Sequence, residues 1–246
     1  MQQLNLISGK TKEQIAIEFI REHEPEEGYF LGFSGGKDSV VLYDLAEKAG
    51  VKFKAYYSST GIDAPEIVKF IRDYYPTVIH KRPKHSFFYY IGSTGYGFPT
   101  RIARWCCTTL KKYPTKKIPL KHRLFGIRAE ESPRRASRGI INYNKRVKQW
   151  IYSPIFNFLE WEVWDYIDDH SLPYCSLYDE GFSRLGCVIC PFLSYPAHQR
   201  HWERWPKHYR AFEKAMRKVW DRGKPNNKPW RESTFDEFLN NWYRGK

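Results

Sequence analysis

Hydrophobic and polar residues are spaced along the chain in a way that predicts strands and helices in turn. Short apolar runs rich in aromatic and β-branched residues predict five strands, at residues 28–34, 51–60, 77–83, 122–128 and 149–155. Helical apolar spacing predicts helices over residues 37–50 and 64–76, and another after Thr11, which has the capping-box partner Gln14. The alternation predicts an α/β fold with a doubly wound, mostly parallel, five-stranded sheet.

The pattern changes after Pro154. A short helix over residues 160–174, a loop with two cysteines and a helical tail rich in Trp and Arg follow. We therefore expect an α/β domain over residues 1–155 and a helical C-terminal subdomain over residues 156–246, with one continuous domain as the alternative. No stretch reaches the ~20 apolar residues of a membrane helix, and the first residues lack a signal-peptide core. The prediction is a cytoplasmic protein without membrane contact.

Charge is concentrated in the middle of the chain. The 246 residues carry a formal net charge of +14. From Arg101 to Lys148 there are 15 Lys and Arg residues and only two acidic ones, Glu130 and Glu131. Such a balance predicts phosphate-rich partners, either nucleotides or nucleic acids, with a merely solvated basic surface as the alternative.

A glycine-rich segment, SGGKDS at residues 34–39, lies between a predicted strand and a predicted helix. A helix N-terminus offers unpaired N–H groups, and glycines let an anion reach them. The segment is not a Walker A loop. It predicts a phosphate site built from Ser34, Gly35, Gly36 and Ser39. Asp38 would orient the loop or a Mg²⁺ ion, and Lys37 would only add charge. The alternative is a helix-capping turn without a ligand.

Four of the five cysteines form two pairs, Cys106–Cys107 and Cys187-x-x-Cys190. Four thiolates are enough for one soft metal centre. Adjacent cysteines suit a tetrahedral zinc ion poorly because neighbouring side chains diverge, and an iron–sulfur cluster tolerates them better. The cysteines therefore favour a cluster, with zinc and a buried thiol set as alternatives. His198 and His201 are further ligand candidates, although four cysteines already suffice.

The order of these motifs resembles a known family. SGGKDS resembles the pyrophosphate-binding loop of the ATP pyrophosphatase superfamily. With the two cysteine pairs, the chain resembles the cluster-bearing branch of the phosphoadenosine phosphosulfate reductase family over Gly28–Pro191. Further matches are a turn at Thr60 and Gly61 and a nucleotide segment with Gly126, Arg128, Ser132 and Arg135. The resemblance implies an adenine nucleotide alpha hydrolase-like fold that binds ATP with Mg²⁺ at the carboxyl ends of the strands. It also implies a [4Fe-4S] cluster on Cys106, Cys107, Cys187 and Cys190.

The sequence departs from that family at three points. No cysteine follows Cys190, whereas sulfonucleotide reductases carry a nucleophilic cysteine near their C-terminus. Ser59 replaces the usual Asp before Thr-Gly, and Cys175 stands where Asn is expected. Cys175 is a candidate sulfur carrier that would act with Asp38 and Ser39 in catalysis, and the alternative is a small buried thiol.

These observations lead to three hypotheses. The first is an enzyme that adenylates DNA, tRNA or a related acceptor with ATP and then inserts sulfur, with a cysteine desulfurase as a candidate partner. The second is a sulfonucleotide reductase that uses Cys175 or a partner's thiol together with a thioredoxin-like reductant. The third is a nucleotide-binding subunit without turnover.

Overall fold

The computed structural model describes residues 9–92, 96–224 and 229–245, which form two compact units. The sheet unit comprises Met1–Tyr57, Pro65–Lys81 and Lys116–Leu185. The helical unit comprises Ser58–Ala64, Arg82–Thr115 and Gly186–Lys246. Both units are therefore discontinuous in sequence, because the chain passes from one unit to the other several times.

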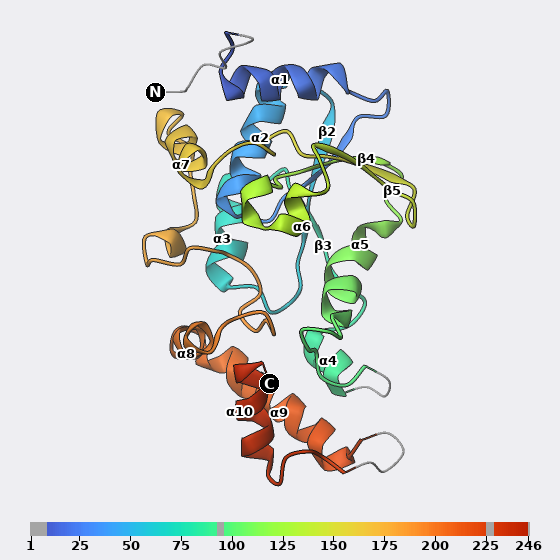
Figure 1. Cartoon of the computed structure of the whole chain (residues 1–246), viewed down its shortest axis with the longest axis vertical. Coiled ribbons are helices and arrows are strands. Elements are labelled where there is room, and N and C mark those ends of the chain that lie inside the picture. Colours follow the sequence, from blue (N-terminus) through green and yellow to red (C-terminus); the bar gives the residue numbers. More distant parts are fainter. Residues whose placement is uncertain (1–8, 93–95, 225–228, 246) are drawn as a thin grey trace. The chain divides into compact units, whose positions relative to one another are not determined.

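The sheet unit contains a mostly parallel sheet, which confirms the predicted fold class (Figure 1). In chain order its strands are β1 Tyr29–Gly32, β2 Phe53–Ser58, β3 Ile79–Lys81, β4 His122–Phe125, β5 Ile141–Asn144 and β6 Gln149–Tyr152. The order across the sheet is β3-β2-β1-β4-β6-β5. β1 pairs in parallel with β2 and β4, and β4 pairs in parallel with β6.

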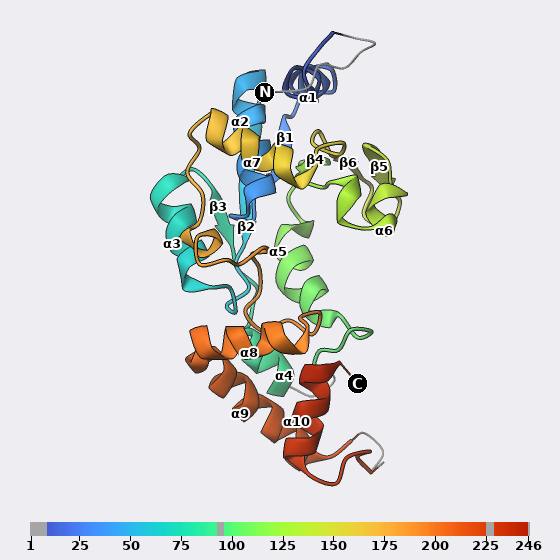
Figure 2. The ribbon, with the colours of Figure 1, turned by 60° about the vertical axis from the view of Figure 1, so that its left-hand side comes forward.

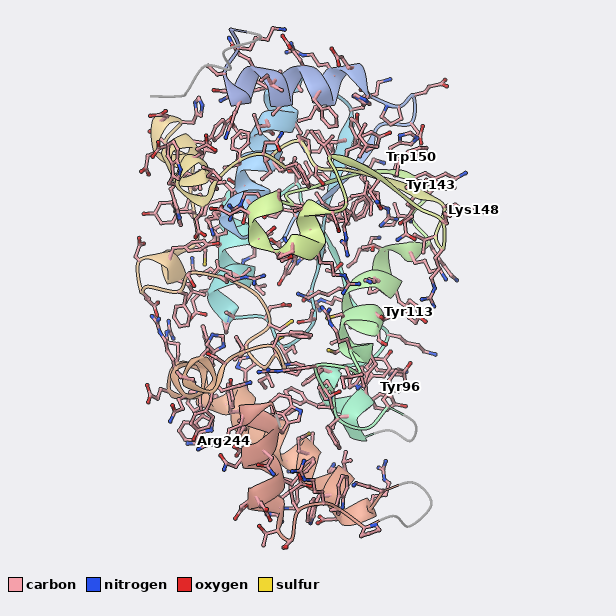
Figure 3. All side chains as sticks on the ribbon, in the orientation of Figure 1. Tyr96, Tyr113, Tyr143, Lys148, Trp150 and Arg244 are labelled. Carbon is pink, nitrogen blue, oxygen red and sulfur yellow. The ribbon has the colours of Figure 1, made fainter. Side chains whose placement is uncertain are left out.

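The sixth strand, β5, corrects the prediction of five. β5 runs antiparallel to β6 at the edge of the sheet, and Tyr143 pairs with Trp150 across the two strands. Both aromatic side chains lie at this edge (Figure 3). The strand is four residues long and none of its residues is fully buried. A short edge strand of this kind has too weak an apolar pattern to be recognised before its partner is known.

Three of the predicted helices form where the sequence places them in the sheet unit. α1 Lys12–Glu22 begins at a capping box made by Thr11 and Gln14. α2 Lys37–Ala49 ends at Gly50, whose φ of 68° is the left-handed conformation that glycine adopts readily. α3 Pro65–Tyr74 buries Ile67, Phe70 and Ile71 along one face. The later α7 Glu160–Asp169 packs against α2, as does α1 (Figure 2).

The helical unit consists of helices packed around an aromatic core. Its members are α4 Phe87–Gly92, the π-helix η1 Cys107–Lys112, α8 Tyr195–Arg204, α9 Pro206–Arg222 and α10 Phe235–Arg244, with α5 Tyr113–Lys116 at its boundary. α9 packs against α4, α8 and α10. Tyr209 and Phe212 are almost completely buried, whereas Trp202 is exposed. The aromatic residues of the tail therefore serve mainly as core, and none of the described helices is long and apolar enough to cross a bilayer.

Candidate functional site: a glycine loop and a group of thiols

The strand order places two loops of the sheet unit at the point where ligands usually bind. β1 has β2 on one side and β4 on the other, so the direction of strand addition reverses at β1. Ligands of doubly wound sheets bind outside the carboxyl ends of the strands at such a switch point. The loops that leave β1 and β4 there contain Gly35–Gly36 and Gly126. A side chain on Gly126 would come within 2.7 Å of the Asp38 carbonyl oxygen, so this glycine permits close approach of the loop after β4 to the first turn of α2.

The glycine loop is held by two serine hydroxyls. Ser39 Oγ donates to the Gly36 carbonyl (2.7 Å) and accepts from the Ser34 amide (3.1 Å), and the two hydroxyl oxygens are 3.2 Å apart. Gly35 has a φ of 74°, in the left-handed region. Gly36 is the N-cap of α2 and provides no side-chain cap. The loop therefore presents the positive end of a 13-residue helix at the switch point, which suits an anion such as phosphate.

Lys37 and Tyr178 contribute to this loop in a way that the sequence did not indicate. The Lys37 side chain is only 4% exposed, and its ammonium lies 3.3 Å from a Glu160 carboxylate oxygen and over the rings of Trp164 and Tyr178. The Lys37 amide donates to the Tyr178 hydroxyl at 3.0 Å. Lys37 thus ties α2 to the start of α7 instead of only adding charge, and Tyr178 caps the first turn of α2.

We expect Tyr178→Phe to lower the free energy of unfolding by about 1 to 2 kcal/mol, because it removes the acceptor of a partly buried amide. Urea denaturation followed by circular dichroism measures the change. Tyr174→Phe is the matched control, since the Tyr174 hydroxyl donates to Asp179 at an exposed site. That control should change stability by less than about 0.5 kcal/mol. Equal effects of the two variants would contradict the capping role.

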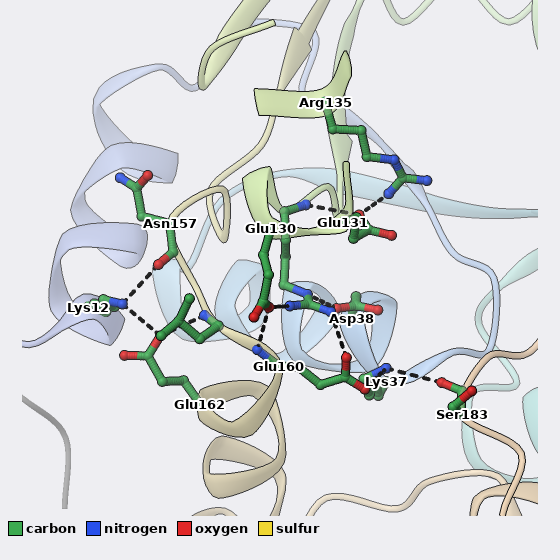
Figure 4. Close-up of polar contacts among 12 residues, drawn as sticks. Lys12, Lys37, Asp38, Glu130, Glu131, Arg135, Asn157, Glu160, Glu162 and Ser183 are labelled. Carbon is green, nitrogen blue, oxygen red and sulfur yellow. Dashed lines mark hydrogen bonds and ion pairs between the residues drawn. The ribbon is translucent and has the colours of Figure 1, made fainter. Parts of the chain in front are cut away.

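Arg128 lies among three carboxylates beside the start of α2. Figure 4 shows these carboxylates, which belong to Asp38, Glu130 and Glu160. The side chain is 4% exposed, with Nε 2.6 Å from Asp38 Oδ1, Nη1 2.5 Å from Glu130 Oε2 and Nη2 3.8 Å from Glu160 Oε2. The ion pair fixes Asp38 in the first turn of α2, and a loop-orienting role of Asp38 stays a prediction. A direct contact of Arg128 with nucleotide stays a prediction, since its guanidinium is already shared among three carboxylates.

Arg135 lies in the electrostatic field of further arginines. Ser132 caps the short helix α6 Pro133–Ala136 and accepts from the Arg135 amide, and the Arg135 side chain pairs with Glu131. Burial lowers the pKa of Arg135, and the nearby guanidiniums of Arg184, Arg138 and Arg128 lower it further while Asp38 opposes them. A contact of Arg135 and Ser132 with nucleotide stays a prediction. Arg184, from the stretch before the second cysteine pair, was not among the predicted site residues.

All four paired cysteines lie in the helical unit. Cys106 is the N-cap of the π-helix η1, and Cys107 is its first residue. The Cys107 thiol, together with burial and the fields of Cys187 and Cys190, raises the pKa of Cys106. The pKa of Cys107 is lowered by its hydrogen bond with Cys106 and by Arg104, whose Nη2 is 3.8 Å from Cys107 Sγ. The fold therefore brings the two pairs into electrostatic reach of each other.

The Thr60–Gly61 turn contacts the second cysteine pair through Cys187. Thr60 Oγ1 lies 3.8 Å from Cys187 Sγ, and the Thr60 amide donates to Asp63 Oδ2 at 2.6 Å. Asp63 forms an antiparallel bridge with Cys187, and Gly61 has a φ of 77°. The turn thus supports the Cys187 loop. The predicted contact of Thr60 and Gly61 with nucleotide stays a prediction.

Within the described ranges, no three Cys, His, Asp or Glu side chains are arranged to hold a metal ion. The thiols are half-buried and have cationic neighbours. The field of the Cys187 thiolate, followed by those of Asp63 and Cys107, raises the pKa of Lys111. Lys111 and Arg104 therefore place positive charge beside the cysteines, as an anionic metal centre would require.

Three further candidate residues from the sequence, Cys175, His198 and His201, are held by burial or by hydrogen bonds within the protein. Cys175 is 1% exposed, and burial raises the pKa of its thiol. This environment favours the alternative interpretation of Cys175 as a small buried thiol. His198 Nδ1 lies 2.8 Å from the Tyr209 hydroxyl, and burial lowers the pKa of His198 to about 4. His201 Nδ1 lies 2.8 Å from the Val188 carbonyl between the cysteines of the second pair. Both histidines thus serve the packing around the Cys187 loop.

A glycine loop at the switch point of a doubly wound sheet defines a nucleotide-binding α/β protein. The sequence profile of the phosphoadenosine phosphosulfate reductase domain matches residues 28–193, and the chain belongs to this family. Adenosine 5'-phosphosulfate reductase from Shouchella clausii is 26% identical over 208 residues, which cover 81% of this chain and 86% of that protein.

Two other comparisons extend this result. An uncharacterized protein of Methanocaldococcus jannaschii is 31% identical over 218 residues, 83% of this chain and 45% of that protein. The chain spans less than half the length of this relative and of a second one from the same organism. The fold is similar to that of phosphoadenylyl-sulfate reductase from Candida auris, with a TM-score of 0.57 at 18% identity over 74% of this chain and 90% of that one.

Proposed function

We propose that the chain is an ATP-dependent sulfur-transfer enzyme that activates a nucleic-acid acceptor by adenylation. The observation that carries the proposal is the glycine loop, which presents Gly36, the N-cap of α2, at the switch point of the sheet. The Arg135 guanidinium lies in the field of Asp38 in the first turn of α2, so positive charge stands near this loop. This arrangement suits the outer phosphates of ATP, whose release as pyrophosphate is the driving step of adenylation.

The reaction has two balanced steps. An acceptor oxygen attacks the α-phosphorus of ATP, a P–O bond forms, and the bond to the α,β-bridging oxygen breaks to release pyrophosphate. Hydrosulfide then attacks the activated atom of the acceptor, and AMP leaves with the acceptor oxygen. No electrons are exchanged when sulfide is the donor. Ser34, Ser39 and the loop amides would hold the leaving phosphates, with Asp38 positioned by Arg128.

Cys106, Cys107, Cys187 and Cys190 would hold a [4Fe-4S] cluster in the helical unit. Each thiolate of such a cluster binds a separate iron atom, so the thiols need not converge on one ion as they must around zinc. The half-buried thiols and the neighbouring Arg104 and Lys111 support this choice. The cluster would supply a site for sulfur, and the protein's cations would offset its negative charge.

Anaerobic purification followed by iron and labile-sulfide assays tests the metal site. We expect Cys187→Ser to lower the iron content to a small fraction of wild type, because one of four ligands is lost. Cys175→Ser, a substitution at the buried fifth cysteine, should retain iron. Zinc in place of iron, or equal iron in both variants, would contradict the cluster.

The activity is measured as AMP and pyrophosphate formed from ATP in the presence of RNA or DNA and sulfide. We expect Ser39→Ala to reduce pyrophosphate release strongly, because Ser39 joins Ser34 to Gly36 within the loop. The exposed Ser137 provides the control variant Ser137→Ala. ATP binding without pyrophosphate release under every acceptor condition would instead indicate a nucleotide-binding subunit.

The similarity to adenosine 5'-phosphosulfate reductase favours a second candidate, reduction of adenylyl sulfate. In that reaction a thiolate attacks the sulfate sulfur, AMP leaves, and a second thiol releases sulfite with formation of a disulfide, so a dithiol reductant supplies two electrons. Sulfite production from adenylyl sulfate, without pyrophosphate release from ATP, would select this alternative.

A further inference from the structure

The outer edge of the sheet unit carries an exposed aromatic pair beside a basic turn. Tyr143 on β5 and Trp150 on β6 are both 41% exposed, and their ring centroids lie 4.8 Å apart with an interplanar angle of 44°. Figure 3 shows them with Lys148 at the end of the β5–β6 hairpin. Large aromatic side chains gain stability by burial, so a cross-strand pair left half in water calls for a second explanation.

Strand pairing places the two aromatic side chains on the same face of the sheet. Trp150 is in register with Tyr143 on β5 and with His122 on β4, so the three side chains share one face. His122 is the member of this set farthest from the sheet edge, and its Nδ1 lies 3.0 Å from the Tyr152 hydroxyl, which holds the His122 ring in place. The aromatic surface is therefore presented by paired strands rather than by a loop.

The segment of chain that carries the pair has charges of one sign only. Between Ser132 and Leu159 the chain has six basic residues and no acidic one. Three of the six, Lys145, Arg146 and Lys148, are exposed in the hairpin turn. The Arg146 amide donates to Asn144 Oδ1, and Lys148 has a φ of 52°, so the turn has a defined shape. Charges at an edge strand also discourage strand pairing, but that role does not account for the exposed rings.

We propose that the β5–β6 hairpin binds single-stranded nucleic acid, with an unpaired base stacked on Trp150 and Tyr143 and the backbone phosphates held by the turn. Aromatic platforms flanked by cations recognise unpaired bases because every base has a π-face and every nucleotide a phosphate. The inference extends the proposed function, on which it rests, by assigning a surface to the acceptor and by requiring that the acceptor be unpaired there.

Fluorescence anisotropy with labelled oligonucleotides of about 12 nucleotides, single-stranded and duplex, tests the proposal on the full chain without ATP. We expect tighter binding of the single strands. Trp150→Ala should weaken that binding by about 5- to 150-fold, the range for loss of one stacked base. Trp150→Phe should retain most of the affinity, because the phenyl ring keeps a stacking face. Trp161→Ala is the control, since Trp161 lies on α7 and is 47% exposed.

The turn is tested by salt dependence. Replacing Lys145, Arg146 and Lys148 by alanine should flatten the slope of log affinity against log salt by about 2, at about 0.7 per phosphate contact on a single strand. Equal binding by Trp150→Ala, Trp150→Phe and wild type, or equal affinity for duplex and single strand, would overturn the proposal. Comparison of RNA with DNA single strands identifies the acceptor type.

This readout separates the two proposals. If Trp150→Ala binds single strands as tightly as wild type while the protein still releases pyrophosphate, only the proposal for the hairpin is rejected. Normal single-strand binding without pyrophosphate release would reject the adenylation chemistry alone. Thermal melting of each variant establishes that it is folded, and Trp150→Phe compared with Trp150→Leu serves if the alanine variant does not fold.

Discussion

Replacing Arg128 by alanine is expected to lower the free energy of unfolding by about 3 kcal/mol. Arg128 is buried and is shared by Asp38, Glu130 and Glu160, so its removal leaves three carboxylates facing one another. Breaking a buried ion pair costs about 3 to 5 kcal/mol. The lower end applies because the side chains of Glu130 and Glu160 are 44% and 53% exposed, and water screens them.

The same variant should bind ATP more weakly. The uncompensated carboxylates stand beside the loop proposed for the phosphates, and like charges repel. Arg128→Lys should recover only part of the loss, because an ammonium cannot reproduce the forked contacts of a guanidinium. Urea denaturation and calorimetric titration with a non-cleavable ATP analogue measure the two effects.

Arg134→Ala is the matched control for Arg128→Ala, since Arg134 is exposed in the same segment. It should alter stability by less than about 0.5 kcal/mol. If Arg128→Ala unfolds at the same urea concentration as Arg134→Ala, the carboxylate group around Arg128 does not organise the loop.

Gly35→Ala is the second substitution with a large expected effect, a loss of about 2 to 5 kcal/mol. The φ of 74° at Gly35 costs a residue with a side chain about 1 to 2 kcal/mol. The new methyl would also lie 2.9 Å from Ile67 Cγ2 and 3.1 Å from Ile71 Cδ1 on α3, and overpacking costs about 1 to 3 kcal/mol. The loop must shift to relieve the contact, so affinity for the ATP analogue should fall along with stability.

Gly50→Ala separates backbone strain from the contact with α3. Gly50 has a φ of 68°, and a methyl placed there meets nothing within 4 Å. This variant should lose only about 1 to 2 kcal/mol of stability and bind the ATP analogue as wild type does. Equal losses in Gly35→Ala and Gly50→Ala, with ATP binding preserved in both, would show that the packing of Gly35 against α3 is not required.

Local signals explain what could be predicted from the sequence. The apolar run of β1, the glycines after it and the helical spacing of α2 are neighbours along the chain, so the strand, loop and helix follow from residues 28–50 alone. The capping box at Thr11 and the glycine stop at Gly50 are local for the same reason. The two cysteine pairs could be recognised from their spacing along the chain. The resemblance based on these motifs pointed to the phosphoadenosine phosphosulfate reductase family, to which the chain belongs.

Only the tertiary structure decided which groups act together. Asp38 and Arg128 are 90 positions apart, Lys37 and Tyr178 are 141 apart, and Thr60 and Cys187 are 127 apart. A hydrogen bond or an ion pair depends on distances of a few ångströms in space, which sequence spacing does not encode across separate elements. The strand and helix pattern therefore determined the glycine loop, whereas the folded path of the chain determined the residues that hold this loop and the threonine that contacts Cys187.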